Sequence, residues 1–167
     1  MSKLSQGAFA SVEFTPALKG YRLDVMKKGV KKDIDRHYTY DIIPPEIDGG
    51  VLLQAPHRLV ATSIEIQLHE PVLVYFIFHD ICDGNYTNIF KDLEEWEKCT
   101  EAPQYDIDPS PHNHPDREHG KPQTMYKLRS TKPGIYRIPT SEKSKNNRDW
   151  YTCNLVFVDI KEGKKEE

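Results

Sequence analysis

The stretch Pro71-Val-Leu-Val-Tyr-Phe-Ile-Phe-His79 decides how the rest of the chain is interpreted. It holds seven consecutive large apolar or aromatic residues, Val72 to Phe78, the longest such run in the sequence. In an extended chain, alternate side chains of this run point to opposite faces, and both faces are apolar. A short run rich in β-branched and aromatic residues is typical of a strand buried on both faces rather than of a helix. We therefore expect it to be the central strand of a sheet.

The stretch before it, residues 63–68, alternates instead. Its even positions are Ile64, Ile66 and Leu68, and its odd positions are polar. This pattern predicts a strand with one buried face, and the three residues that follow are short enough for a hairpin connection. A strand buried on both faces beside a half-buried strand indicates a sheet with a second layer over it.

Similar short stretches, separated by Gly and Pro, recur along the chain. They predict about nine strands with almost no helix, apart from a short helical turn at 90–96. The fold class that follows is all-β, a two-sheet antiparallel β-sandwich or jelly roll. Besides the two strands above, the expected ones are 8–14, 21–26, 37–43, 51–54, 124–128, 134–138 and 150–159.

The chain of 167 residues predicts a single domain, with one long proline-rich loop. Residues 101–123 contain five prolines and many polar residues, so we expect a loop without packed elements there. We expect the sandwich domain to span residues 1–160. Residues 161–167 are highly charged and predict a disordered tail.

Composition bears on partners and location. The net charge is −3 with both signs spread along the chain, which argues against nucleic acid as a partner. No apolar stretch approaches the roughly 18 residues that a membrane span needs, and no signal peptide is visible. The number of cysteines, three, is odd, and no two of them have CxxC spacing. This favours a reduced, cytoplasmic protein. A secreted protein is the alternative if a leader was removed. The oligomeric state stays open.

A histidine cluster in the proline-rich loop is a candidate metal site. His112, His114 and Glu118 have the spacing H-x-H-x3-E, which resembles the first metal motif of cupins, and His119 is a fourth candidate ligand. This resemblance implies a metal-dependent cupin-like enzyme that binds a transition metal. An ordinary polar loop is the favoured interpretation, because Pro111 before the motif and Pro115 within it exclude a central strand.

Two further motifs follow the central strand. Asp80, Asp83 and Asn85 place oxygen ligands around a glycine, as in a structural calcium site, although a plain Asp/Gly turn is the favoured interpretation. Cys82 or Cys99 with His79 could form a nucleophilic pair, but no third catalytic group accompanies them. We therefore expect inert thiols and predict no catalytic residue and no required cofactor.

Aromatic residues near loops are the most suggestive feature. Tyr86, Trp96 and Trp150 could stack on sugar rings or anchor a protein partner, while Asp80, Asp83 and Asn85 could supply hydrogen bonds. The competing interpretation is that both tryptophans close the ends of the sandwich core.

Residue patterns over 38–138 resemble the galactose-binding-like β-sandwich modules attached to polysaccharide-degrading enzymes. The features are an aromatic strand ending in Ile43-Pro-x-x-Ile47-x-Gly49, a Val-Tyr strand ending in Asp80, a loop tryptophan, and a late strand at Pro133-Gly134-x-Tyr136. The resemblance implies a non-catalytic module that binds a glycan or a protein partner. A cupin-like enzyme and a structural or assembly protein remain the alternatives.

Overall fold

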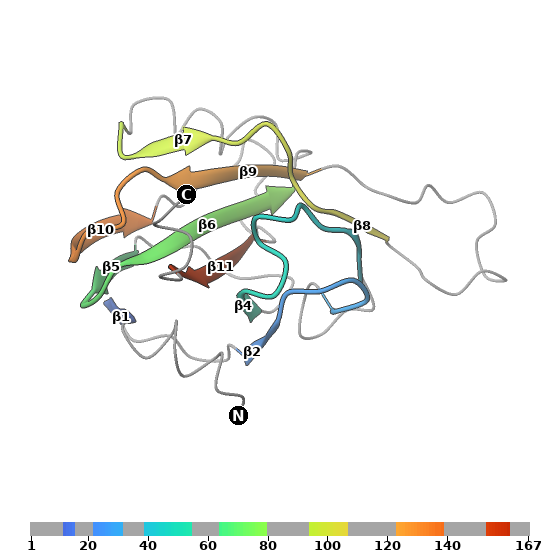
Figure 1. Ribbon diagram of the computed structural model, residues 1–167, viewed down its shortest axis with the longest axis horizontal. Helices are drawn as coiled ribbons and strands as arrows, with labels where there is room; N and C mark the ends of the chain where they lie inside the picture. The colour runs from blue at the N-terminus through green and yellow to red at the C-terminus, as the bar shows by residue number, and fades with distance from the viewer. Residues whose placement is uncertain are drawn as a thin grey trace, which may run out of the picture.

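The computed structural model describes residues 12–15, 22–31, 39–54, 64–79, 94–106, 123–138 and 153–160. These residues form antiparallel strands, which confirms the predicted all-β class (Figure 1). They include no helix long and apolar enough to cross a membrane. The strands are β1 (Val12–Thr15), β2 (Arg22–Val25), β3 (Thr39–Ile42), β4 (Val51–Gln54), β5 (Ile64–Leu68), β6 (Val72–His79), β7 (Trp96–Lys98), β8 (Gln104–Asp106), β9 (Gln123–Leu128), β10 (Gly134–Ile138) and β11 (Cys153–Asp159).

The strands form a sandwich of a large and a small sheet with a further two-stranded ribbon. The large sheet has six strands in the order β2-β4-β11-β6-β9-β7, and the small one has three in the order β1-β5-β10. Strands β3 and β8 pair with each other. The seven-residue apolar run lies in β6, between β11 and β9, so the predicted central strand is confirmed.

One face of β6 packs on a long connection between β2 and β4. Tyr75 and Ile77 belong to a cluster of buried side chains on this face. Met26, Tyr40 and Ile47 come to that cluster from the connection. Two backbone hydrogen bonds join the two ends of this connection. The Gly49 amide donates to the Met26 carbonyl at 2.7 Å, and the Met26 amide donates to the Gly50 carbonyl at 2.8 Å. Gly49 makes this turn possible with a φ of 89°, which side-chain-bearing residues rarely adopt.

The opposite face of β6 packs toward the three-stranded sheet. Phe76 on this face contacts Trp96 of β7, and the Trp96 Nε1 donates to the Arg137 carbonyl of β10 at 3.2 Å. In the small sheet Ile66 and Leu68 are buried while the alternating polar residues Glu65 and Gln67 are exposed. The predicted half-buried strand is therefore confirmed, and β6 is buried on both faces.

The predicted hairpin between residues 64–68 and 72–78 is wrong. Strand β5 pairs with β1 and β10 in the small sheet, whereas β6 belongs to the large one. The reason is that β9 and β11 already occupy both edges of β6. Residues 69–71 therefore cross from one sheet to the other.

Two local predictions need correction. Of the expected helical turn at 90–96, residues 90–93 lie outside the described residues; the described end is a turn at Glu94–Glu95 followed by strand β7, where Trp96 pairs with Leu128 and is buried. The expected loop at 101–123 contains β8, which pairs with β3 immediately after the buried Pro103. The remainder of that loop, residues 107–122, lies outside the described residues, as does the tail 161–167.

Candidate functional site

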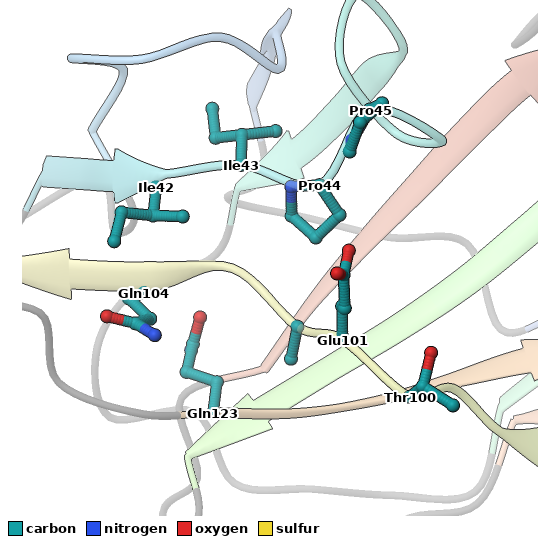
Figure 2. A pocket seen from close by; sticks show the side chains of 9 residues that line it. Ile42, Ile43, Pro44, Pro45, Thr100, Glu101, Gln104 and Gln123 are labelled. Carbon is teal, nitrogen blue, oxygen red and sulfur yellow. The ribbon is translucent and has the colours of Figure 1, made fainter.

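A pocket of about 410 Å³ lies where the two-stranded ribbon meets one end of the large sheet (Figure 2). Its volume is within the range of about 300–1,000 Å³ that is usual for small-molecule sites. Its walls come from three separate segments: the end of β3 with the following prolines, the connection from β7 to β8, and the first residue of β9. The lining residues are Ile42, Ile43, Pro44, Pro45, Thr100, Glu101, Ala102, Gln104 and Gln123.

The first wall is apolar and follows from the way β3 ends. Pro44 and Pro45 stop the strand because proline has no amide hydrogen for the ladder. Their carbonyls instead accept from the next turn, from the Ile47 amide at 3.2 Å and from the Asp48 amide at 3.3 Å. Ile42, which precedes them, keeps 51% of its surface exposed. This wall therefore offers proline rings and an aliphatic side chain to a ligand.

The second wall is built where the chain leaves the large sheet. The Cys99 amide still donates to the Met125 carbonyl at 2.9 Å, one residue beyond β7. Thr100, Glu101 and Ala102 then cross the gap to β8, whose Gln104 pairs with Ile42. In Figure 2 the Glu101 side chain extends from this crossing toward the Pro44 ring. The wall thus adds a hydroxyl and a carboxylate opposite the prolines.

Gln123 forms the polar end of the pocket. It is the first residue of β9 and pairs with His79, the last residue of β6. Only 7% of its surface is exposed, and neither its Oε1 nor its Nε2 has a hydrogen-bond partner among the described residues. A buried amide without partners costs about 1–3 kcal/mol, so such groups are rare in folded proteins. An amide held in this state beside a pocket is suited to receive a ligand.

Ionisable groups behind the second wall are held in their neutral forms. Burial, then the Glu46 carboxylate and a hydrogen bond to it, raise the pKa of the Tyr75 phenol. Burial, and after it Glu46, also raise the pKa of the Cys99 thiol to about 11, although Lys127 opposes this. Because a thiolate is the reactive form of cysteine, Cys99 is a poor nucleophile at neutral pH.

The predicted ligand-binding residues are only partly located. Trp96 is 3% exposed, with its ring in the core and its Nε1 bonded to β10. This burial corrects the expectation that Trp96 offers a stacking face, and it agrees with the competing core interpretation. The other expected contacts lie outside the described residues: Tyr86, Trp150, Asp80, Asp83 and Asn85.

The candidate metal ligands also fall outside the described part of the chain. These are His112, His114, Glu118 and His119. Within the described part, no group of three or more His, Cys, Asp or Glu side chains could hold a metal ion. The cupin-like hypothesis therefore stays a prediction.

Sequence reasoning missed the pocket because its residues are far apart in the chain. In the sequence, Pro44 and Pro45 indicate the end of a strand but not the wall of a pocket. Nothing in the sequence around Gln123 marks it, since its burial depends on a strand pairing with His79 and on the approach of β8. Only the topology joins these three segments.

Comparison with known proteins identifies a fold but no family. No family model and no curated protein matches the sequence. Among solved structures, a β-glucuronidase from glycoside hydrolase family 2 matches with a TM-score of 0.55 and 13% identity, over 90% of this chain and 14% of that chain. A GH138 enzyme targeting pectin rhamnogalacturonan II matches with a TM-score of 0.46 and 14% identity, over 90% of this chain and 16% of that chain. The chain thus has the fold of a small part of a much longer enzyme.

Proposed function

We propose that this chain is a non-catalytic β-sandwich module that binds a glycan at the end of the sandwich where β3, β8 and β9 meet. Two lines of support lead to this proposal. The first is the pocket itself, which combines apolar rings with unpaired polar groups. The second is that the fold matches part of an enzyme named for a sugar substrate, which agrees with the resemblance drawn from residues 38–138.

The observation that carries the proposal is the unpaired, buried amide of Gln123. Sugars present hydroxyl groups around a ring whose C–H faces are apolar. A site for them needs hydrogen-bonding groups on one side and apolar surface on the other. Gln123 and Glu101 supply the hydrogen-bonding groups, and Pro44, Pro45 and Ile42 supply the apolar surface. The described residues of the pocket thus provide both parts.

The predicted polar contacts extend this site in the proposal. Asp80 follows His79 in the sequence, and His79 pairs with Gln123. The stretch containing Asp80, Asp83 and Asn85 thus follows, in the sequence, the residue that pairs with Gln123. In the proposal these side chains contact further hydroxyls, and Tyr86 and Trp150 stack on neighbouring sugar units. Trp96 is left out because its ring is buried.

A glycan array probed with the purified chain tests the proposal. We expect binding to a restricted set of oligosaccharides, loss of this binding in Gln123→Met, and full binding in Gln67→Met, which changes an exposed glutamine on β5. An array without signal would refute glycan binding. A protein partner captured in a pull-down would then support the alternative binding function.

The enzyme alternative has a separate test. Metal analysis of the purified chain and of His114→Ala distinguishes a binding module from a cupin-like catalyst. We expect no stoichiometric metal in either protein. A stoichiometric metal that is lost in His114→Ala would instead support the metal-dependent enzyme.

A further inference from the structure

We infer that the pocket selects a neutral sugar. In this inference Gln123 determines the specificity of the pocket, because its amide hydrogen-bonds to two adjacent hydroxyl groups of the ligand. This inference rests on the proposed glycan-binding function and adds the ligand class. It follows from three properties of the described pocket: the chemistry of the Gln123 amide, the charge of the opposite wall, and the apolar character of the wall at Pro44 and Pro45.

The Gln123 amide needs both a donor and an acceptor from its ligand. Its Oε1 accepts hydrogen bonds and its Nε2 donates them, and the structure leaves both without partners among the described residues. Two hydroxyls on neighbouring ring carbons can satisfy them together, because one hydroxyl donates to Oε1 while the other accepts from Nε2. The amide is therefore matched to a vicinal diol.

Other common sugar substituents match this amide less well. A carboxylate only accepts hydrogen bonds, so it would leave Oε1 buried and unpaired. An N-acetyl group is a trans amide whose N–H and C=O point in opposite directions, so it can pair with one Gln123 atom but not with both. A site built around a hydrogen-bonding group discriminates strongly against a ligand that leaves that group unpaired.

The charge of the pocket also favours a neutral ligand. Among the described residues that line the pocket, Glu101 is the single charged one, and its side chain extends toward Pro44 (Figure 2). A ligand carboxylate about 4 Å from this group would bind about fivefold more weakly in water because of like-charge repulsion. A sugar hydroxyl would instead donate to the same carboxylate. Glu101 thus disfavours uronic acids and favours their neutral counterparts.

The wall at Pro44 and Pro45 completes the selection. Pro44 is buried and Pro45 is exposed, and both rings line the pocket. Together with Ile42 they offer a surface without hydrogen-bonding groups apart from the carbonyls used by the following turn. Such a surface suits the C–H face of a sugar ring while its hydroxyl edge meets Gln123 and Glu101.

Matched pairs of methyl glycosides test this inference on the full chain. The probes are methyl galactoside with methyl galacturonide, methyl glucoside with methyl glucuronide, and the 3-deoxy and 4-deoxy forms of the neutral sugar that binds. Affinities are measured by NMR titration of the wild type, Gln123→Met, Glu101→Gln and the control Gln67→Met. We expect the neutral member of a pair to bind about fivefold or more tightly, with a smaller difference in Glu101→Gln.

The deoxy sugars test the role of Gln123 specifically. Removing either hydroxyl of the diol should weaken binding to the wild type about tenfold, whereas Gln123→Met should bind the parent and deoxy sugars equally weakly. Equal or tighter binding of the uronides, or deoxy sugars that bind as well as the parent, would overturn this inference while leaving glycan binding intact. Failure of every glycoside here and of every glycan on the array would overturn both.

Discussion

The rings of Phe76 and Trp96 pack against each other with centroids 6.3 Å apart and planes inclined by 60°. The two residues lie on β6 and β7, which are separated by β9, so the contact reaches diagonally across a strand. Both side chains are buried, at 1% and 3% exposed. Tilted aromatic pairs contribute about 0.5–1.5 kcal/mol beyond their buried area, so this pair is a centre of stability for the sandwich.

Phe76→Ala should be among the most destabilising substitutions in the chain. We expect a loss of about 3–5 kcal/mol from the buried area and the cavity left behind. A domain has only about 5–15 kcal/mol of stability in total, so the variant should be poorly soluble or molten. Urea denaturation followed by circular dichroism measures the change. Glu65→Ala, on the exposed face of β5, is the control and should change stability by less than about 0.5 kcal/mol. Equal tolerance of both substitutions would contradict the central position of β6.

Tyr40→Phe should destabilise the core through a single lost oxygen. The Tyr40 hydroxyl donates to the Asn154 Oδ1 at 2.6 Å in a buried setting, and the Asn154 Nδ2 donates on to the Leu53 carbonyl. Breaking a buried hydrogen bond of this kind costs about 1–3 kcal/mol. Tyr136→Phe is the matched control, because its hydroxyl bonds to the exposed Lys132 carbonyl. Thermal unfolding that shifted equally in both variants would argue against a special role for the buried bond.

Gln123→Met should make the protein more stable while removing its binding. The substitution keeps the length of the side chain but replaces an amide that has no partner among the described residues. Relief of the unpaired groups should raise the free energy of unfolding by about 1–3 kcal/mol. Functional sites often carry such a cost in stability. Chemical denaturation checks this against Gln67→Met, which should leave stability unchanged. A clearly destabilised Gln123→Met would mean that the amide has a structural role instead.

Cys99 should react slowly with alkylating agents in the folded protein. Its pKa of about 11, compared with an ordinary value of 9.0, leaves very little thiolate at pH 8. Iodoacetamide labelling, resolved by peptide mass, should proceed about tenfold or more slowly at Cys99 than in the urea-unfolded chain. Alkylation at the rate of the unfolded chain would refute the raised pKa.

The raised pKa of Cys99 should also make the folded protein less stable as the pH rises into the alkaline range. Between pH 9 and 11 the folded state keeps the Cys99 proton while the unfolded state loses it. The unfolded state therefore binds fewer protons in this window, and stability falls as the pH rises. Replacing Cys99 by Ala should make this decline shallower. An unchanged slope between pH 9 and 11 would mean that the thiol contributes nothing to it.

The sequence predicts the core of this fold well because local patterns suffice there. The run around Phe76 is apolar on both faces, and residues 64–68 alternate, so burial could be inferred without knowing the neighbours. The partners of each strand could not be inferred from local patterns. Whether β5 pairs with β6 or crosses to another sheet depends on which strands occupy the edges of β6, and those strands, β9 and β11, come much later in the chain.

The candidate site was harder to predict for the same reason. Sequence reasoning looked for aromatic and acidic residues close together in loops, and it selected Trp96 for its residue type. The ring of Trp96 is buried because pairing with Leu128 turns it toward Phe76. No local sequence pattern marks Gln123. The position of its side chain depends on two strand pairings between distant parts of the chain, that of Gln123 with His79 and that of β8 with β3.

The side-chain amide signals of Gln123 in a ¹H–¹⁵N spectrum show whether a ligand binds at this amide. These signals are assigned by their absence in Gln123→Met, and a neutral oligosaccharide from the array is then added to the wild type. We expect both amide proton signals to shift and to saturate with the same affinity as the backbone amides of Glu101 and Ala102. Amide signals of Gln123 that stay in place while the chain binds the oligosaccharide would contradict this expectation, because binding would then occur elsewhere.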